Sequence, residues 1–135
     1  MPHSTRRKVS LRATLLNMDL KIESLPGSRA GVRLLRLTGP FTLPGIFEFQ
    51  SIVRGLDQPV VIVDLTAVPF MDSAALGAVM FLHASSQRKQ HKYALAGANE
   101  RLHTLFKVGG VDEILVTFPT VEEAEAKLLG QAPSS

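Results

Sequence analysis

The chain has 135 residues and a formal net charge of +3, and 45% of its residues are hydrophobic and 20% are charged. This length and composition indicate one globular domain, since domains most often contain roughly 100–150 residues, and they exclude a disordered or fibrous chain. The sequence contains no cysteine, which excludes disulfide frameworks, iron–sulfur clusters, Cys-bearing zinc sites and thiol nucleophiles.

Residues 1–16 are predicted to form a basic tail outside the folded domain, which we place at residues 18–130. The tail has no acidic residue and contains Arg6, Arg7, Lys8 and Arg12. Four charges are a weak electrostatic footprint, and one Tyr without any Trp offers little base stacking, so we expect no direct DNA binding.

The longest apolar run is far shorter than the ~18–20 residues that a membrane span requires, and no secretory signal is evident, so we expect a cytoplasmic protein without membrane insertion.

The first predicted elements form a β-hairpin. Residues 18–23 alternate apolar and charged side chains, which is the period of a half-buried strand. A Pro-Gly-Ser-Arg-Ala-Gly turn sequence at 26–31 separates them from a second predicted strand at 32–37. Gly39 and Pro40 should end that strand.

Helices and strands alternate through the rest of the chain. Residues 46–56 carry apolar side chains at helical offsets, and residues 59–65 form a continuous apolar run typical of a parallel strand covered on both faces. A loop at 66–71 then precedes a long predicted helix at 73–89. The remaining predicted elements are a strand at 92–97, a helix between Asn99 and Gly109, a strand at 114–118 and a helix that begins with the capping sequence Thr120-Val121-Glu122-Glu123.

The predicted order is therefore β-β-α-β-α-β-α-β-α. Alternation of strands and helices after an initial hairpin predicts an α/β fold with a mixed, mostly parallel sheet, right-handed crossovers and about four helices. The hairpin should supply an antiparallel edge to this sheet.

No sequence pattern points to an enzyme or a cofactor site. The glycine-rich phosphate loops and the H-E-x-x-H motif are absent, the histidines lack ligand spacing, and His83 is interpreted as structural. The G-x-S-x-G elbow of serine hydrolases is also absent around Ser73. Asp64 follows a buried strand, but residues 38–41 offer no second carboxylate for a receiver-type Mg²⁺ site, so we interpret Asp64 as a turn residue. We expect no catalytic residue, cofactor or metal.

Asp72 and Ser73 stand where the long helix should begin, and either could cap it, because Asp and Ser oxygens commonly accept its free backbone N–H groups. A helical projection directs Ala75, Leu76, Val79, Leu82 and His83 toward the sheet. The opposite face carries Ser73, Gly77, Phe81, Ala84 and Arg88, with Met80 at the boundary. An amphipathic helix normally has a polar outer face. This face and the loop residues Phe70 and Met71, which we expect to be exposed, therefore predict a partner-binding surface, unless the C-terminal helix or a second copy of the chain covers it.

The chain resembles the STAS domain family of anti-sigma factor antagonists over roughly residues 18–130. The residues that carry the resemblance are Leu37-Thr38-Gly39, the strand at 60–65, Phe70-Met71-Asp72-Ser73, Leu76-Gly77, Leu95-Ala96-Gly97, Leu102, Phe106 and Gly109. One departure is Ala74-Ala75, where the family often has Ser-Gly.

The resemblance implies a function that the residues alone do not. In the family, a partner that is both anti-sigma factor and serine kinase phosphorylates the serine after the loop aspartate, and only the unphosphorylated form binds this partner and frees the sigma factor. By this resemblance, Ser73 is the phosphate acceptor, Asp72 is its neighbour, and the chain is a substrate and not an enzyme. A phosphatase and a second copy of the chain are further partners to consider. The same fold also serves as a non-phosphorylated cytoplasmic subunit of membrane (ABC-type) transporters, and small-molecule binding is a third alternative.

Overall fold

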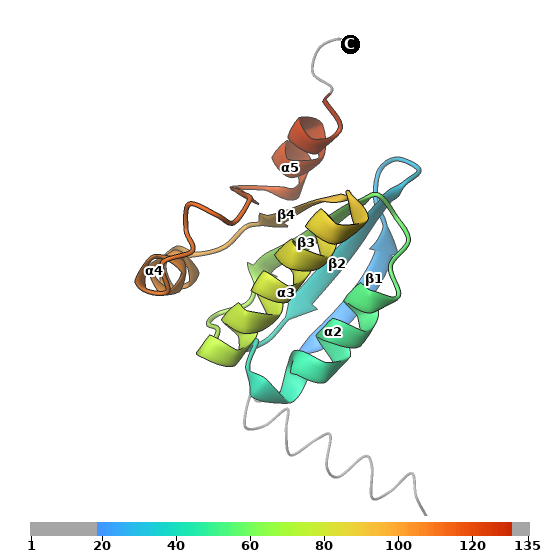
Figure 1. Ribbon diagram of the computed structural model, residues 1–135. Coiled ribbons are helices and arrows are strands. Elements are labelled where there is room, and N and C mark those ends of the chain that lie inside the picture. Colours follow the sequence, from blue (N-terminus) through green and yellow to red (C-terminus); the bar gives the residue numbers. More distant parts are fainter. Residues whose placement is uncertain (1–18, 131–135) are drawn as a thin grey trace, which may run out of the picture.

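A computed structural model describes residues 19–130 as a five-stranded sheet in the order β1-β2-β3-β4-β5 (Figure 1). The pairing of β1 with β2 is antiparallel, and the other neighbouring strands are parallel. The strands are β1 (Lys21–Pro26), β2 (Val32–Thr38), β3 (Val60–Ala67), β4 (Lys92–Ala96) and β5 (Thr117–Phe118). The helices are η1 (Leu43–Gly45), a single 3-10 turn, and α2 (Ile46–Arg54), α3 (Ser73–Lys89), α4 (Glu100–Val108) and α5 (Val121–Leu128). The predicted α/β fold with an antiparallel hairpin edge is confirmed.

The sheet has a hydrophobic core on each face because successive side chains of a strand point to opposite sides. Along β3, Val61 and Val63 contact the larger core, which α2, α3 and α4 cover, whereas Val60 and Ile62 contact the smaller core beneath α5. In Figure 1, α2 and α3 lie side by side over one face. This double coverage explains why the β3 sequence is apolar without alternation.

Several predicted boundaries are corrected by long-range pairing. The first strand lies at Lys21–Pro26 and not at 18–23, because it pairs with β2 from Lys21 opposite Thr38 to Pro26 opposite Arg33. The helix predicted to reach residue 56 ends at Arg54 with Gly55 as its C-cap, and the loop predicted from residue 66 starts later, because β3 continues to Ala67. The predicted tail at 1–16 lies outside the described residues.

The last strand is shorter than the sequence predicts. Only Thr117 and Phe118 pair with β4, opposite Leu95 and Ala96. Residues 111–115 form a turn, in which the backbone N–H groups of Ile114 and Leu115 both donate to the Val111 carbonyl at 3.0 Å. The apolar run at 114–118 is therefore divided: Ile114 and Leu115 belong to the turn, with Leu115 in the same core as α4, and Thr117 and Phe118 form β5.

The loop before α3 is held in place from both sides. On one side, Phe41 and Met71 form an isolated parallel bridge, in which Phe41 N–H donates to the Phe70 carbonyl at 3.1 Å and Asp72 N–H donates to the Phe41 carbonyl at 3.3 Å. On the other side, the Asn99 side-chain amide donates to the carbonyls of Val68 and Pro69, each at 3.3 Å. The start of α3 is thus fixed relative to the sheet. Among residues 19–130, no helix is long and apolar enough to span a bilayer.

Candidate functional site

Asp72 is the residue that caps α3. Its backbone is extended, its Oδ1 accepts from the Ala75 N–H at 2.9 Å, and its Oδ2 accepts from the Leu43 N–H at 3.0 Å. One carboxylate therefore satisfies a free N–H group at the start of α3 and also ties this helix to η1. The expected capping of α3 is confirmed and assigned to Asp72 rather than Ser73.

Ser73 is the first residue of α3 and is exposed. Because Asp72 supplies the cap, the Ser73 hydroxyl is not needed for it, and this hydroxyl makes no side-chain hydrogen bond within the described part of the chain. The free N–H groups and the dipole of the helix N-terminus favour an anion at this position. The Ser73 hydroxyl is therefore open to solvent, at a helix terminus that favours an anion.

The helical projection of α3 agrees with the structure. On the sheet side, Ala75, Val79 and Leu82 are buried, and Leu76 and His83 are half-buried. The outer side carries the exposed residues Ser73, Gly77, Ala84 and Arg88 and the half-buried residues Met80 and Phe81.

His83 has a structural environment, as predicted. Its Nδ1 lies 2.9 Å from the Tyr93 hydroxyl, and the two rings meet edge to face at 5.6 Å. Burial raises the pKa of Tyr93, and the Val116 N–H, which donates to the hydroxyl oxygen at 3.2 Å, lowers it in part.

The interpretation of Asp64 as a turn residue is wrong, because Asp64 lies within β3 and pairs with Arg36 on β2 and Ala96 on β4. Its Oδ1 accepts from the backbone N–H and the hydroxyl of Thr66, and its Oδ2 lies 3.7 Å from the Arg36 Nε.

No contact with the described residues 19–130 requires glycine at position 77. Its φ is not in the left-handed region, and a Cβ built on it would meet no atom within 4 Å. Glycine within a helix is less stable than alanine by about 1 kcal/mol. The fold would therefore gain from alanine at position 77, and the glycine leaves the outer face of α3 open to close approach.

The two apolar loop residues before Asp72 differ in exposure. The Phe70 side chain is 36% exposed, with the Arg101 guanidinium 5.4 Å from its ring centre. Met71 is only 8% exposed, because its bridge to Phe41 places it in the larger core. The expectation that Met71 is exposed is wrong, and its side chain is not available to a partner in this conformation.

Two exposed apolar residues on η1 and α2, the elements that contact α3, were missed in the sequence. Leu43 is 62% exposed and Phe47 is 79% exposed, and the backbone of Leu43 contacts Asp72 directly. Phe47 falls outside the apolar offsets of α2, so a projection of that helix could have identified it. We call the outer face of α3 with these neighbours, and with Arg54 over the Phe81 ring, the α2–α3 surface; it consists of Leu43, Phe47, Arg54, Phe70, Ser73, Gly77, Met80, Phe81, Ala84 and Arg88.

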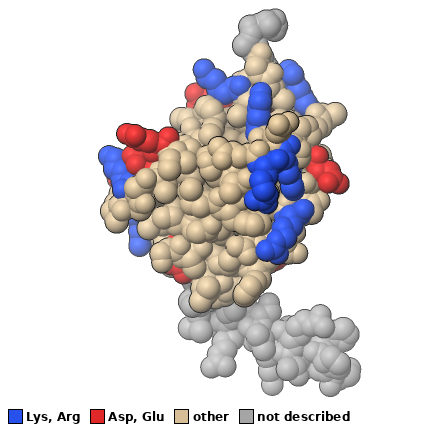
Figure 2. All heavy atoms as spheres, in the orientation of Figure 1, with Lys and Arg blue, Asp and Glu red and all other residues tan. Residues whose placement is uncertain are grey.

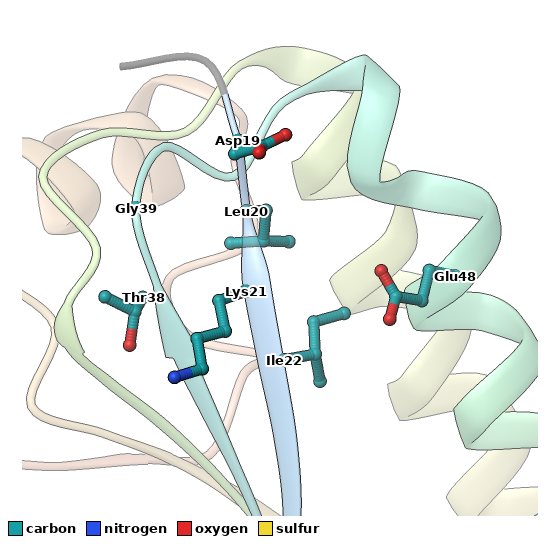
Figure 3. Close-up of a pocket in the computed structure, with 7 residues that line it drawn as sticks. All are labelled: Asp19, Leu20, Lys21, Ile22, Thr38, Gly39 and Glu48. Atoms are coloured by element: carbon teal, nitrogen blue, oxygen red, sulfur yellow. The ribbon is translucent and has the colours of Figure 1, made fainter. Parts of the chain in front are cut away.

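A separate hollow of about 550 Å³ lies at the β1 edge of the sheet (Figure 3). It is lined by Asp19, Leu20, Lys21, Ile22, Thr38, Gly39 and Glu48. None of the predicted site residues lines it, and its charged groups are of both signs. Within residues 19–130, no cluster of three His, Asp or Glu side chains could hold a metal ion.

The family model described as the STAS domain matches residues 28–124, and the chain belongs to this family. The resemblance identified from the sequence is therefore confirmed.

Relatives with assigned names fall into two groups. An anti-sigma-B factor antagonist of Listeria monocytogenes is 25% identical over 100 residues, which are 74% of this chain and 88% of that protein. The solved anti-sigma factor antagonist SpoIIAA, in its unphosphorylated form, has a TM-score of 0.67 at 16% identity, with 83% of this chain and 97% of that chain covered. A sulfate transporter family protein from Wolinella succinogenes has a TM-score of 0.67 at 22% identity, with 76% and 90% covered. The two structural likenesses show the shared fold.

Proposed function

We propose that this protein is an anti-sigma factor antagonist controlled by phosphorylation of Ser73. In the unphosphorylated form, the α2–α3 surface binds a serine-kinase anti-sigma factor and so frees a sigma factor, which places the protein in the cytoplasm. The observation that carries the proposal is the exposed Ser73 hydroxyl at the first position of α3, beside a separate capping residue. The similarity to the Listeria antagonist supports it.

Phosphorylation should act on the interface more than on the fold. A phosphate adds about −1.5 to −2 charges at pH 7. The helix N-terminus tolerates this anion within the protein, but a partner must desolvate it beside the Asp72 carboxylate and an apolar surface. Each ~1.4 kcal/mol of this penalty weakens affinity tenfold, so a few kcal/mol would release the partner.

The chain is the substrate of this reaction, and the kinase supplies the catalytic groups. The role of Ser73 is to present its hydroxyl, and Asp72 positions it by fixing the first turn of α3. Phe70, Gly77, Met80, Phe81, Ala84 and Arg88 are proposed to contact the partner, with Leu43 and Phe47 added by the structure and Met71 withdrawn as a surface residue.

The test is a kinase assay with the purified serine-kinase anti-sigma factor of the same organism and ATP. Intact mass should rise by one phosphate, and Ser73→Ala should abolish the rise. Ser24→Ala, at an exposed serine of β1, is the matched control and should leave it unchanged. Phosphate on another residue, or none with a kinase that is active on a second substrate, would overturn the proposal.

The alternative function is that of a non-phosphorylated subunit of an ABC-type transporter. The fold that this chain shares with the Wolinella protein supports this alternative. The two functions differ in what the protein binds in its host. Affinity purification that recovers a transporter ATPase, together with an unmodified Ser73 under all growth conditions, would favour the transporter role. Recovery of the anti-sigma factor, lost on phosphorylation, would favour the antagonist.

A further inference from the structure

The α2–α3 surface ends in a cluster of positive charge at the C-termini of both helices. Arg54 lies in the last turn of α2, and Arg88 lies in the last turn of α3. The Arg54 guanidinium is 5.3 Å from the centre of the Phe81 ring on α3, so it bridges the two helices. Lys89 is close in sequence but donates to the Leu56 carbonyl at 3.2 Å.

These two arginines have no acidic partner within residues 19–130. The ion pairs found in that range are Lys21–Glu23 and Arg36–Asp64, both elsewhere. The α3 sequence contains no Asp or Glu, and α2 contains only Glu48, in its first turn. Asp57 follows α2 and forms no ion pair with the residues that the structure describes. Positive charge at this end is therefore free to meet a partner.

Figure 2 shows how this charge is distributed on the face that α2 and α3 cover. The lower front, over the N-terminal ends of the two helices, is mostly free of charged side chains, whereas Lys and Arg side chains gather at the middle right, over the C-terminal ends. The surface thus has an apolar half around Ser73, with exposed Leu43 and Phe47 and the half-buried Asp72 carboxylate, and a cationic half around Arg54 and Arg88.

Arg88 is remote from the phosphate acceptor, and Arg54 is nearer to it. Ser73 and Arg88 are 15 residues apart on one helix (88 − 73), which corresponds to about 22 Å along its axis. Arg54 lies over Phe81, which is 8 residues from Ser73 (81 − 73), or about 12 Å along the same axis. Both distances exceed the Debye length of about 8 Å at physiological ionic strength, so a phosphate on Ser73 leaves the attraction at Arg88 largely unchanged and weakens the attraction at Arg54 in part.

We infer that the partner presents acidic side chains to Arg54 and Arg88, and apolar side chains to Leu43 and Phe47. This inference rests on the proposed function and adds the chemistry of the partner surface to it. The cationic half steers and orients the partner, since complementary charge mainly raises the association rate, and the apolar half around Ser73 carries the switch. A protein is the favoured occupant, because two arginines beside an apolar surface suit a protein interface, in which Arg is enriched, and are too few for nucleic acid.

The test measures the affinity of the purified serine-kinase anti-sigma factor for unphosphorylated protein at low and high salt. Arg54→Glu with Arg88→Glu should weaken binding by about 2- to 30-fold at low salt, the sum of two exposed ion pairs, and should flatten the salt dependence. The matched control is Lys127→Glu, since Lys127 lies in the last turn of α5, on the opposite face of the sheet. Thermal unfolding checks whether the charge reversal perturbs the fold. If it does, the milder double variant Arg54→Gln with Arg88→Gln takes its place in the binding measurement.

The outcomes separate this inference from the proposed function. If Ser73 phosphorylation releases the partner while the arginine variants bind as tightly as the unmodified protein, with the same salt dependence, the inference is overturned and the function stands. If no binding or phosphorylation is found at all, the function itself fails. A third result, in which the arginine variants lose binding to vesicles containing phosphatidylserine or to duplex DNA but keep the partner, would assign the charge to lipid or nucleic acid and also overturn the inference.

Discussion

Replacing Gly77 with alanine should stabilise the isolated protein and weaken its binding to the anti-sigma partner. Position 77 lies within α3, its φ is not positive, and an added Cβ meets no atom within 4 Å. The full difference in helix propensity, about 1 kcal/mol, should therefore appear as added stability. For a domain of this size, the gain corresponds to a rise of about 3–6 °C in Tm.

The same methyl group should be unfavourable at the interface. Overpacking a tightly packed contact costs about 1–3 kcal/mol, which corresponds to about 5- to 150-fold in Kd. Thermal unfolding measures the gain in stability, and isothermal titration with the anti-sigma factor measures the loss of affinity. Gly77→Leu, with its larger side chain, should weaken the affinity further. Ala126→Leu, at an exposed position of α5, controls for added bulk and should not change the affinity. A lower Tm for Gly77→Ala would refute the reasoning about the fold, and an unchanged Kd for Gly77→Leu would show that the partner does not approach this face.

Three further predictions concern stability, pH and the missed apolar residues. Asp72→Ala should lower the free energy of unfolding by about 2 kcal/mol in urea titrations, because it removes the helix cap and the bond to the Leu43 N–H, each worth about 1 kcal/mol; a loss below about 0.5 kcal/mol would contradict this. Tyr93 is the sole tyrosine, and burial raises its pKa, so tyrosinate absorbance should appear above the ordinary value near 10. Stability should fall as pH rises through the folded-state pKa, because the unfolded chain releases this proton first; titration at or below 10 in the folded protein would be inconsistent. Phe47→Ser should change stability by less than about 0.5 kcal/mol yet weaken partner binding, whereas Val108→Ser, at an equally exposed residue of α4, should change neither.

Local sequence signals were sufficient where the structure depends on local chemistry. The bounds of α3 were predicted correctly, because Asp72 at its start is a strong capping residue and no Pro or helix-ending Gly interrupts the segment before Lys89. The faces of α3 also follow from its helical period. The cap of α4 by Asn99, whose side chain accepts from the Leu102 N–H, was predicted on the same basis.

Contacts between distant segments decided what the sequence did not predict. The register of β1 depends on its pairing with β2, and the length of β5 depends on where β4 ends. Phe70 and Met71 are both apolar loop residues, and only the bridge between Phe41 and Met71 determines which of them is buried. The error about Met71 arises from this long-range packing, and so does the omission of Leu43, whose backbone is joined to Asp72. Phe47 could have been found from the helical period of α2 alone.

The central claim is tested most directly by titrating the serine-kinase anti-sigma factor with two preparations of this protein, one unphosphorylated and one carrying a single phosphate on Ser73. We expect the phosphorylated form to bind at least about 100-fold more weakly, which corresponds to about 2.7 kcal/mol, with an unchanged circular dichroism spectrum. Equal affinity of the two forms would contradict the account, because the exposed hydroxyl at the start of α3 would then have no role in release.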